Sequence, residues 1–291
     1  MYFLNINKPK GMSSFDVIRE LRKRLKIKQI GHSGTLDPLA SGVLQIAVGK
    51  ATKLLDYLES DKEYIADIVF GYVSETFDSE APLVFQKDPS FSKSDLIETL
   101  NAFLGKTMQI PPKYSAIKQN GKKLCDLARD NKEIDIKSFE REIEIYSIEL
   151  LEFEDYKAKI KVFCKKGTYI RSLVNDIGQK LGCGAYMSDL IRTKAGNFLI
   201  ENSNKIDDEY SKLNPLDVIN LAQVELNQAE FERVKNGNFI VREVSLSTDT
   251  ILLTKDNKLV SNANLSDNLI KPKKFFKEEE WIHSLKRFLL V

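Results

Sequence analysis

The chain contains few residues of the kinds that build metal sites and disulfide frameworks. Its 291 residues include three cysteines and two histidines, His32 and His283. Cys125, Cys164 and Cys183 are odd in number and widely spaced, and no two of them form a Cys-x-x-Cys pair. This pattern argues against a disulfide framework and a zinc site, and it is typical of a reducing compartment. We therefore expect no bound metal.

Long hydrophobic runs are absent as well. No apolar run approaches the roughly 18 residues that suggest a membrane-spanning helix. The first residues, MYFLNINKPKG, place a short apolar stretch before the lysines, which is the reverse of the order in a signal peptide. We therefore expect a cytoplasmic protein with no membrane partner.

Net charge alone does not indicate a nucleic-acid partner, because it is only +2. The basic residues are nevertheless concentrated in clusters: Arg19, Arg22, Lys23, Arg24, Lys26 and Lys28; Lys118, Lys122 and Lys123; Lys165 and Lys166; and Lys271, Lys273 and Lys274. Each cluster can be a solvated helix face or a contact to a phosphate backbone. Their position beside glycine-rich loops makes the second interpretation as strong as the first.

The spacing of apolar residues predicts helices and strands in mixed order. Ser13 or Ser14 can cap a helix that runs to about Leu25, and Thr168 can cap another. Residues 92–104 form a further predicted helix, with Leu96, Ile97, Leu100 and Phe103 on one face and Gly105 at its end. The strands are predicted at 43–48, at 63–73 in the middle of a sheet, and at 142–145 and 157–164 with one face buried.

This order of elements lacks a regular βαβ alternation and predicts an α+β fold. A polar segment at about 202–214 predicts a linker, so we expect a first domain over 1–213 and a small, mostly β module over 214–291. Within that module we expect a helix at 228–235 and a strand at 251–254.

The segment GHSGTLDPLASGVL, residues 31–44, places one carboxylate, Asp37, on a loop before the buried strand at 43–48. Its glycines weaken a helix, and Pro38 disfavours helix at the residue before it. An acid held by the backbone at the end of a strand suits a catalytic group. The alternative is an Asp-Pro turn in which the Asp side chain bonds its own backbone.

Three further side chains are candidates for a site. Arg171 falls in the first turn of its helix, where the dipole disfavours a cation, so it is either a tolerated surface residue or a partner for a carboxylate or phosphate. Tyr64, near the start of a strand, can be core packing or a stacking surface. His32 can carry protons, form structural hydrogen bonds or insert among bases.

Five segments together resemble the TruB family of RNA pseudouridine synthases, in the family's order and over about residues 5–198. The segment at 31–44 matches the family's signature loop. The others are NINKPKGMSSFDV, KEYIADIVFG, IPPKYSAIKQNGKKLCDLAR and KKGTYIRSLVNDIGQKLGCGA. Two departures occur: Ser74, Glu75, Thr76, Phe77, Asp78 and Ala81 stand where the family usually has Thr-Asp-Thr-x-Asp-x-x-Gly, and Cys125 stands where a Tyr is usual.

The resemblance assigns roles to individual residues. It implies that Asp37 is the nucleophile, that Arg171 pairs with it, and that Tyr64 stacks on the target uracil. It implies that His32 occupies the place vacated by the flipped nucleotide, and we expect Asp78 to be a supporting acid behind the site. Lys8, Lys118 and Lys122 are the expected RNA contacts.

The resemblance also implies the fold and the reaction. It implies a pseudouridine synthase fold with a mixed, mainly antiparallel sheet flanked by helices, an insertion at about 106–140 that closes over RNA, and a divergent C-terminal module like a PUA domain. The expected reaction isomerises the T-loop uridine of tRNA, position 55, to pseudouridine. Reactant and product contain the same atoms, so we expect no cofactor, metal or energy source, and no obligate protein partner.

Two other functions stay open from the sequence. One is a non-catalytic RNA-binding protein or tRNA-folding chaperone with the same fold. The other is an unrelated Asp-dependent hydrolase of nucleosides or sugars, which typically uses a second carboxylate.

Overall fold

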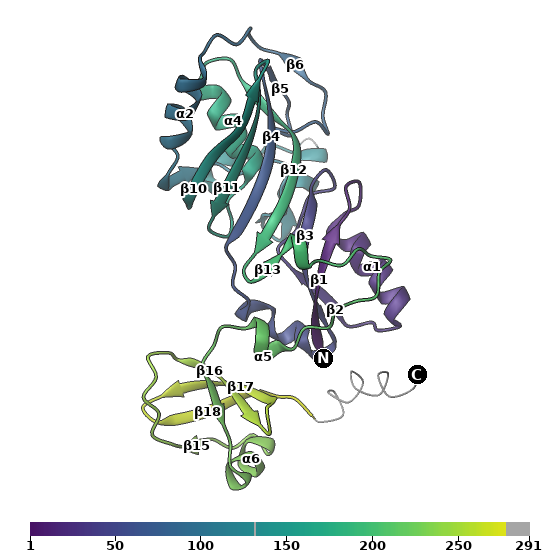
Figure 1. Cartoon of the computed structure of the whole chain (residues 1–291), viewed down its shortest axis with the longest axis vertical. Coiled ribbons are helices and arrows are strands. Elements are labelled where there is room, and N and C mark those ends of the chain that lie inside the picture. The colour runs from purple at the N-terminus through teal and green to yellow at the C-terminus, as the bar shows by residue number, and fades with distance from the viewer. Residues whose placement is uncertain (131, 278–291) are drawn as a thin grey trace.

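The described residues form two main β-sheets, a larger one in the N-terminal part of the chain and a smaller one in the C-terminal part, together with two short two-stranded sheets (Figure 1). The computed structural model describes residues 1–130 and 132–277. Residue 131, within the predicted insertion, and residues 278–291, which include His283 and the end of the predicted C-terminal module, lie outside the described residues.

The larger sheet has nine strands in the described residues, ordered β1-β3-β12-β4-β11-β10-β7, with β2 paired to β3 and β13 paired to β12. All its pairings are antiparallel except that of β12 with β3. The strands are β1 Tyr2–Lys8, β2 Ile30–Ser33, β3 Ser41–Val48, β4 Lys62–Phe70, β7 Gly105–Gln109, β10 Arg141–Glu154, β11 Lys157–Cys164, β12 Ala185–Ala195 and β13 Phe198–Leu199. This arrangement confirms the predicted α+β fold with a mixed, mainly antiparallel sheet.

Helices cover the larger sheet at two places. Helices α2 (Lys93–Asn101) and α4 (Ile170–Lys180) pack over a buried cluster that includes Ile68, Ile160 and Ile177. Helix α1 (Ser14–Leu25) packs through Val17, Ile18 and Leu21 on a second cluster beside β1 and β3. Within the described ranges, no helix combines the length and the apolar character needed to cross a membrane.

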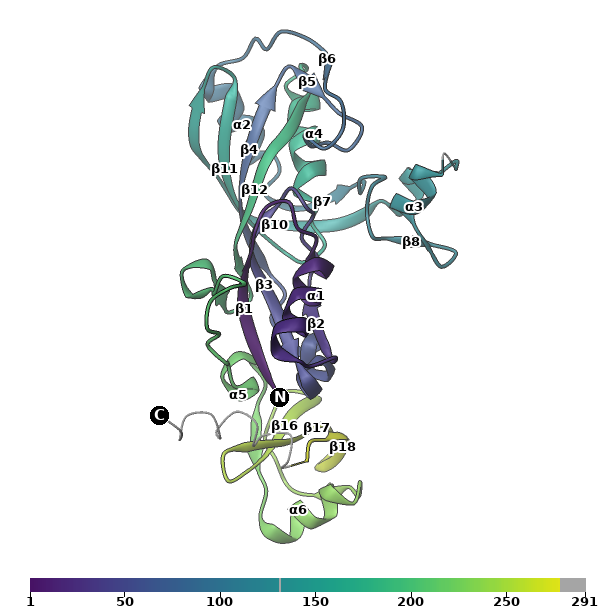
Figure 2. The same ribbon diagram turned by 90° about the vertical axis from the view of Figure 1, so that its right-hand side faces the viewer.

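The remaining elements of the first part are short. They are η1 Gly49–Tyr57, β5 Tyr72–Val73, β6 Val84–Phe85, β8 Lys118–Gln119, β9 Lys122–Lys123, α3 Leu124–Arg129, η2 Ile136–Phe139 and η3 Ile200–Asn202. The β8–β9 hairpin turns at Asn120 and Gly121, both with positive φ, as an Asn-Gly turn favours. This hairpin and α3 project from the larger sheet (Figure 2).

The C-terminal part contains α5 Pro215–Val218, α6 Gln228–Lys235 and a five-stranded sheet in the order β14-β16-β17-β18-β15. Its strands are β14 Gln223–Glu225, β15 Ile240–Val241, β16 Thr250–Lys255, β17 Lys258–Ser266 and β18 Leu269–Phe275. It is joined to the larger sheet by a shared apolar cluster that includes Phe3, Leu54, Leu252 and Phe276.

The polar segment at 202–214 is not a free linker, because it lies along β1. The backbone of Phe3 exchanges two hydrogen bonds of 2.9 Å with Leu213, and Asn204 bonds the backbone of Asn5 and Asn7. The segment therefore occupies hydrogen-bonding groups of β1, the end strand of the main sheet path.

Most predicted elements are confirmed, and three details were wrong. Helix α1 begins at a capping box in which Ser13 and Asp16 bond each other's backbone N–H, and α6 has the predicted bounds. Thr168 does not cap α4, because its hydroxyl donates to the carbonyl of Lys165. Ile97 was predicted on the apolar face of the helix at 92–104, but it is 41% exposed. The strand predicted at 63–73 is interrupted at Gly71, which has a φ of +90°.

The parallel contact between β3 and β12 predicts a sharp sensitivity at Gly42. Its φ is +103°, and a Cβ there would lie 2.2 Å from the backbone oxygen of Arg192. We expect Gly42→Ala to lower the free energy of unfolding by about 3 kcal/mol, from backbone strain together with displacement of β12. Gly11→Ala is the matched control, because Gly11 has a φ of +86° and a Cβ added to it would have no atom within 4 Å. Urea denaturation measures the free energy of unfolding of both variants. Equal decreases for Gly42→Ala and Gly11→Ala would show that the close approach of Arg192 to Gly42 does not matter for stability.

Candidate active site

Asp37 lies on the loop between β2 and β3, and three contacts fix that loop. The Ser14 hydroxyl accepts from the backbone N–H of Leu36 at 2.8 Å and donates to its carbonyl at 3.0 Å. The backbone N–H of Gly11 donates to the carbonyl of Pro38. Leu36 and Leu39 are buried in the cluster beneath α4. The carboxylate is therefore carried by a loop that is held on both sides of Asp37.

Arg171 joins this loop to two others. Its guanidinium Nη2 lies 2.8 Å from Asp37 Oδ2, and Nη1 lies 3.4 Å from Asp78 Oδ2. Nη1 also donates to the carbonyl of Thr76 at 3.0 Å, and Nη2 donates to the carbonyl of Tyr114 at 2.9 Å. The Arg171 side chain is only 4% exposed, whereas that of Asp37 is 38% exposed. The sequence expectation of a carboxylate partner for Arg171 is confirmed.

Asp78 is a fully buried carboxylate behind Arg171. Its Oδ1 accepts from the hydroxyl of Thr76 at 2.5 Å and from the backbone N–H of Glu80 at 3.0 Å. The loop that carries Asp78 includes Phe77, a non-glycine residue with a φ of +63°. A buried carboxylate requires a cation and hydrogen bonds to offset its lost hydration, and this loop together with Arg171 supplies both.

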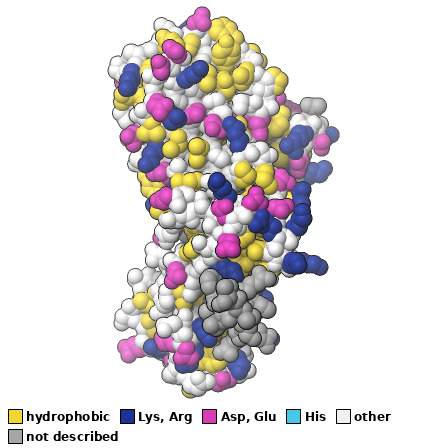
Figure 3. All heavy atoms as spheres, turned by 45° about the vertical axis from the view of Figure 1, so that its right-hand side comes forward, with side chains coloured by type: hydrophobic (Ala, Val, Ile, Leu, Met, Phe, Trp, Pro, Cys, Tyr) yellow, Lys and Arg dark blue, Asp and Glu magenta, His cyan; other side chains and the backbone are white. Residues whose placement is uncertain are grey.

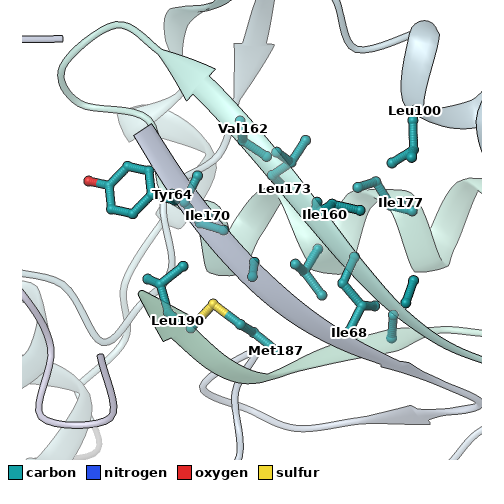
Figure 4. Packing of buried hydrophobic residues seen from close by; sticks show 14 of the residues in the cluster. Tyr64, Ile68, Leu100, Ile160, Val162, Ile170, Leu173, Ile177, Met187 and Leu190 are labelled. Carbon is teal, nitrogen blue, oxygen red and sulfur yellow. The ribbon is translucent and has the colours of Figure 1, made fainter. Parts of the chain in front are cut away.

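A cavity of about 290 Å³ opens beside Asp37 and Arg171. Tyr64 lines it and is 7% exposed. Figure 4 shows the Tyr64 ring at the end of the buried cluster, with its hydroxyl pointing away from the labelled aliphatic side chains. Burial raises the pKa of the Tyr64 phenol, and the neighbouring Arg192 guanidinium opposes that rise. Both interpretations of Tyr64 therefore fit its position, because its ring is packed in the core and also forms part of the cavity wall.

Three cations in the cavity wall, Lys62, Arg141 and Arg192, were not among the sequence candidates. Arg192 is fully buried, and its Nε and Nη2 donate to the carbonyls of Val43 and Gly34. Lys62 stands two residues before Tyr64 on β4 and lines the same cavity. Lys62 could have been found from its spacing, since alternate residues of a strand share a face. Arg192 had no comparable signal, because its neighbours come from distant segments: Gly34 after β2, Val43 of β3 and Tyr64 of β4.

Lys8 and His32 lie close to the Asp37 loop but do not line the cavity. Lys8 is fully buried and donates to the carbonyls of Pro9 and Met12. Burial lowers its pKa to about 8, opposed first by Asp37. This burial does not fit the expectation that Lys8 contacts RNA directly. His32 is half-buried on β2, where burial and then Arg192 lower the pKa of its imidazole, and its Nδ1 has no hydrogen-bond partner.

Lys118 and Lys122 are exposed on the β8–β9 hairpin, outside the cavity wall. Ser115 and Ala116, which precede that hairpin, line the cavity. Figure 3 shows Lys and Arg side chains gathered along the right-hand edge of its face. The structure therefore brings together Asp37, Arg171 and Tyr64, supports them with Asp78, and places the two hairpin lysines farther out.

A second hollow, of about 610 Å³, lies on β4, β10 and β11 and is lined by the carboxylates of Asp67, Glu152, Glu154 and Asp155. Burial raises the pKa of Asp67. Lys157 and Lys159 line the same hollow, and Lys159 pairs with Glu152. Among residues 1–130 and 132–277, no three His, Cys, Asp or Glu side chains form a group that could hold a metal ion.

Comparison with known protein families gives two matches that together span most of the first part of the chain. Residues 22–170 match the model of the TruB family pseudouridylate synthase, N-terminal domain. Residues 171–214 match the model of the tRNA pseudouridylate synthase B C-terminal domain. The two models meet at Arg171.

Individual proteins are similar over nearly the whole chain. A protein of Syntrophomonas wolfei subsp. wolfei named tRNA pseudouridine synthase B is 40% identical over 298 residues, covering 96% of this chain and 99% of its own length. One of the same name from Fusobacterium nucleatum subsp. nucleatum is 42% identical, covering 93% and 98%. One from Clostridium kluyveri is 51% identical over 201 residues, which is 69% of each chain.

Solved structures agree with the fold. The crystal structure of a Cbf5-Nop10-Gar1 complex contains a chain that matches with a TM-score of 0.70 and 25% identity, covering 96% of this chain and 86% of that one.

The Arg171 contacts predict a large loss of stability when the cation is removed. Arg171→Met leaves the Asp78 carboxylate buried without its cation, so we expect it to lower the free energy of unfolding by about 3–5 kcal/mol. Asp78→Asn in the same chain removes the uncompensated charge and should restore part of that loss. Urea denaturation of the two single variants and the double variant measures the coupling. Additive effects, or a loss below about 1 kcal/mol for Arg171→Met, would contradict a buried ion pair.

Proposed function

The chain belongs to the TruB family of pseudouridine synthases, enzymes that isomerise uridine in RNA, and from that membership we propose that its substrate is the T-loop uridine at position 55 of tRNA. We further propose that Asp37 is the nucleophile, with Arg171 holding it and Tyr64 stacking on the base. The observation that supports this most directly is the geometry of Asp37, a half-exposed carboxylate anchored by a buried arginine at the wall of a cavity.

The proposed reaction rearranges one nucleotide without adding or removing atoms overall. The bond between uracil N1 and ribose C1′ breaks, the base turns within the cavity, and a new bond joins C5 to C1′. The proton on C5 leaves, and N1 gains a proton from water or the protein. The base must first leave its stack, which costs a few kcal/mol and is least costly in a loop. A loop uridine is therefore a suitable substrate.

The two oxygens of Asp37 have different surroundings. Oδ2 is held by Arg171, whereas Oδ1 has no hydrogen bond or ion pair within the described residues. We propose that Oδ1 faces the substrate. It can attack C1′, add to the base or take a proton from the sugar, and each route uses the same anchored carboxylate.

Tyr64 offers a flat surface at the cavity wall, and a base stacked on it gains interaction without sequence readout. Its ring is packed in the hydrophobic cluster, so its orientation is set before the base arrives. Stacking on a rotationally fixed ring loses little conformational entropy, and this is the property we propose for Tyr64.

The other candidate residues take supporting roles in this proposal. Lys118 and Lys122, exposed on a projecting hairpin, suit phosphate contacts as the insertion closes over the T-arm. Lys8 supports the segment that bonds the Asp37 loop through Gly11. His32, lying on β2 just before that loop, is proposed to fill the space left by the flipped nucleotide.

We propose a domain boundary near residue 214, with 1–213 as the catalytic domain and 214–291 as an RNA-binding module related to PUA domains. Its described part is a separate five-stranded sheet. Lys271, Lys273 and Lys274 lie along β18, and all three are exposed. Such a row of cations suits the phosphate backbone of a tRNA that extends beyond the active site.

The hydrolase alternative requires a second carboxylate facing the substrate. In the described residues that line the cavity, Asp37 is the only carboxylate. Asp78 is buried behind Arg171 and is engaged by Thr76 and Glu80. Tritium release from C5-labelled uridine in tRNA separates these functions, because a synthase releases that tritium and neither a hydrolase nor a binding protein does.

Asp37→Asn tests the nucleophile. The amide retains size and most hydrogen bonding but cannot act as a carboxylate, so we expect tritium release to fall below about 1% of the wild-type rate. Binding of tRNA should remain within about threefold, because the RNA contacts are unchanged. Turnover above that level in Asp37→Asn would rule out the assignment.

Tyr64→Phe and Tyr64→Leu separate stacking from core packing. Phe retains the ring, and we expect it to bind the substrate hairpin nearly as tightly as Tyr. Leu should lose roughly 1–3 kcal/mol of binding free energy because it cannot stack on the base. Leu should also lower the melting temperature, since Tyr64 is 7% exposed in the core. Melting temperature and single-turnover rate are therefore measured on the same preparations, and a folded Leu variant with the wild-type rate would remove Tyr64 from the site.

A further inference from the structure

Lys62 and Tyr64 lie on the same face of β4, because alternate residues of a strand point the same way. Both line the cavity beside Asp37. The intervening Glu63 points to the opposite face, where it pairs with Lys161 of β11 at 3.2 Å. Lys62 therefore points into the cavity, whereas Lys161 points to the opposite face of the sheet.

Lys62 and Arg192 converge on one point beside Gly34. A Cβ at Gly34 would lie 3.5 Å from Lys62 Nζ and 3.5 Å from Arg192 Nη1. The two cations are therefore neighbours in space although 130 residues separate them in the chain.

Neither cation has a carboxylate partner within the described residues. Lys62 Nζ donates to the carbonyl of Ser60 at 2.7 Å, and Arg192 donates to the carbonyls of Val43 and Gly34. Arg192 Nη1 is buried and has no hydrogen-bond acceptor. Arg192 is buried and Lys62 is half-buried. Cations in such surroundings usually have an anionic partner, and the described residues supply none for this pair.

The electrostatics of Lys62 agree with that geometry. Burial lowers the pKa of its ammonium to about 8, and the nearby positive charge of Arg192 contributes to that lowering, with Asp61 acting in the opposite direction. The other two arginines of the cavity wall are already engaged. Arg171 pairs with two carboxylates, and Arg141 donates to the carbonyl of Gly167 and lies over the Tyr169 ring.

We propose that Lys62 binds one backbone phosphate of the RNA next to the nucleotide that enters the Asp37 cavity, with Arg192 as a second positive charge behind it. This inference rests on the proposed function, because the phosphate belongs to the RNA substrate. A phosphate fits better than a base carbonyl, because a phosphate carries a full negative charge and can therefore be the anionic partner that these two cations do not have among the described residues. Gly34 leaves the approach open, since a side chain there would lie 3.0 Å from Lys62 Cε.

The experiment compares Lys62→Met with Lys161→Met, a lysine of the adjacent strand that points to the opposite face. Both are placed in the Asp37→Asn chain so that RNA binds without turnover. The ligands are a T-arm hairpin and three versions with a single neutral methylphosphonate linkage, on the 5′ side of the target uridine, on its 3′ side, and at a remote stem position. Dissociation constants are measured over a range of salt concentrations.

We expect Lys62→Met to weaken binding of the unmodified hairpin by about tenfold, as loss of one charge-assisted contact predicts. The slope of log Kd against log salt should decrease by about 0.7–0.9, the value for one phosphate. On one of the two hairpins that are neutral beside the target, the same substitution should change Kd by less than about twofold. Lys161→Met should leave affinity and slope unchanged. An equal loss for Lys62→Met on all four hairpins would overturn the proposal.

Stability provides an internal control. Lys62→Met removes a half-buried cation that lies next to another, so we expect its melting temperature to equal or exceed that of the parent chain. A melting temperature that is not lowered excludes unfolding as the cause of weaker binding. The two proposals also fail separately. Absence of tritium release from the wild-type enzyme would contradict the proposed reaction. If the wild-type enzyme releases tritium but Lys62→Met loses the same affinity on all four hairpins, only the phosphate contact is contradicted.

Discussion

The ion pairs of Arg171 are the interaction on which the candidate site depends. One buried guanidinium contacts Asp37, Asp78 and the carbonyls of Thr76 and Tyr114, which belong to three loops far apart in the chain. None of these loops has a core of its own. The arginine sits in the first turn of α4, whose apolar face is buried on the sheet, so its position is set by the most extensively packed part of the molecule.

The same sheet accounts for the unequal distribution of charge in the cavity wall. Strand β4 lies between β12 and β11, and its alternation directs Lys62 and Tyr64 to one side and Glu63 to the other. The neighbouring strand β12 adds Arg192, which is paired in register with Tyr64 and lines the same cavity. Among the described residues that line it, the cavity therefore has one carboxylate and several cations, a distribution that favours the approach of an anionic molecule.

Features that follow from local chemistry could be predicted from the sequence, and features that follow from long-range packing could not. The Ser13 cap and the alternation of β11 are local and were predicted correctly. The position of Arg171 in the first turn of its helix left a surface residue or an anionic partner open, and the resemblance to the family implied the pairing with Asp37 that the structure contains. The burial of Lys8 and of Arg192 arises where strands that are distant in the chain pack together. The periodicity of a single segment contains no information about such long-range packing.

The segment at 202–214 has a consequence for the solubility of the folded chain. Strand β1 ends the main sheet path, and the unpaired backbone groups of a terminal strand can recruit a strand from another molecule. Asn204 and Leu213 occupy part of that row. The polar segment thus shields an edge against self-association while it leads the chain toward the C-terminal sheet. Shortening it would expose the edge of β1 to other molecules even though the Asp37 loop was untouched.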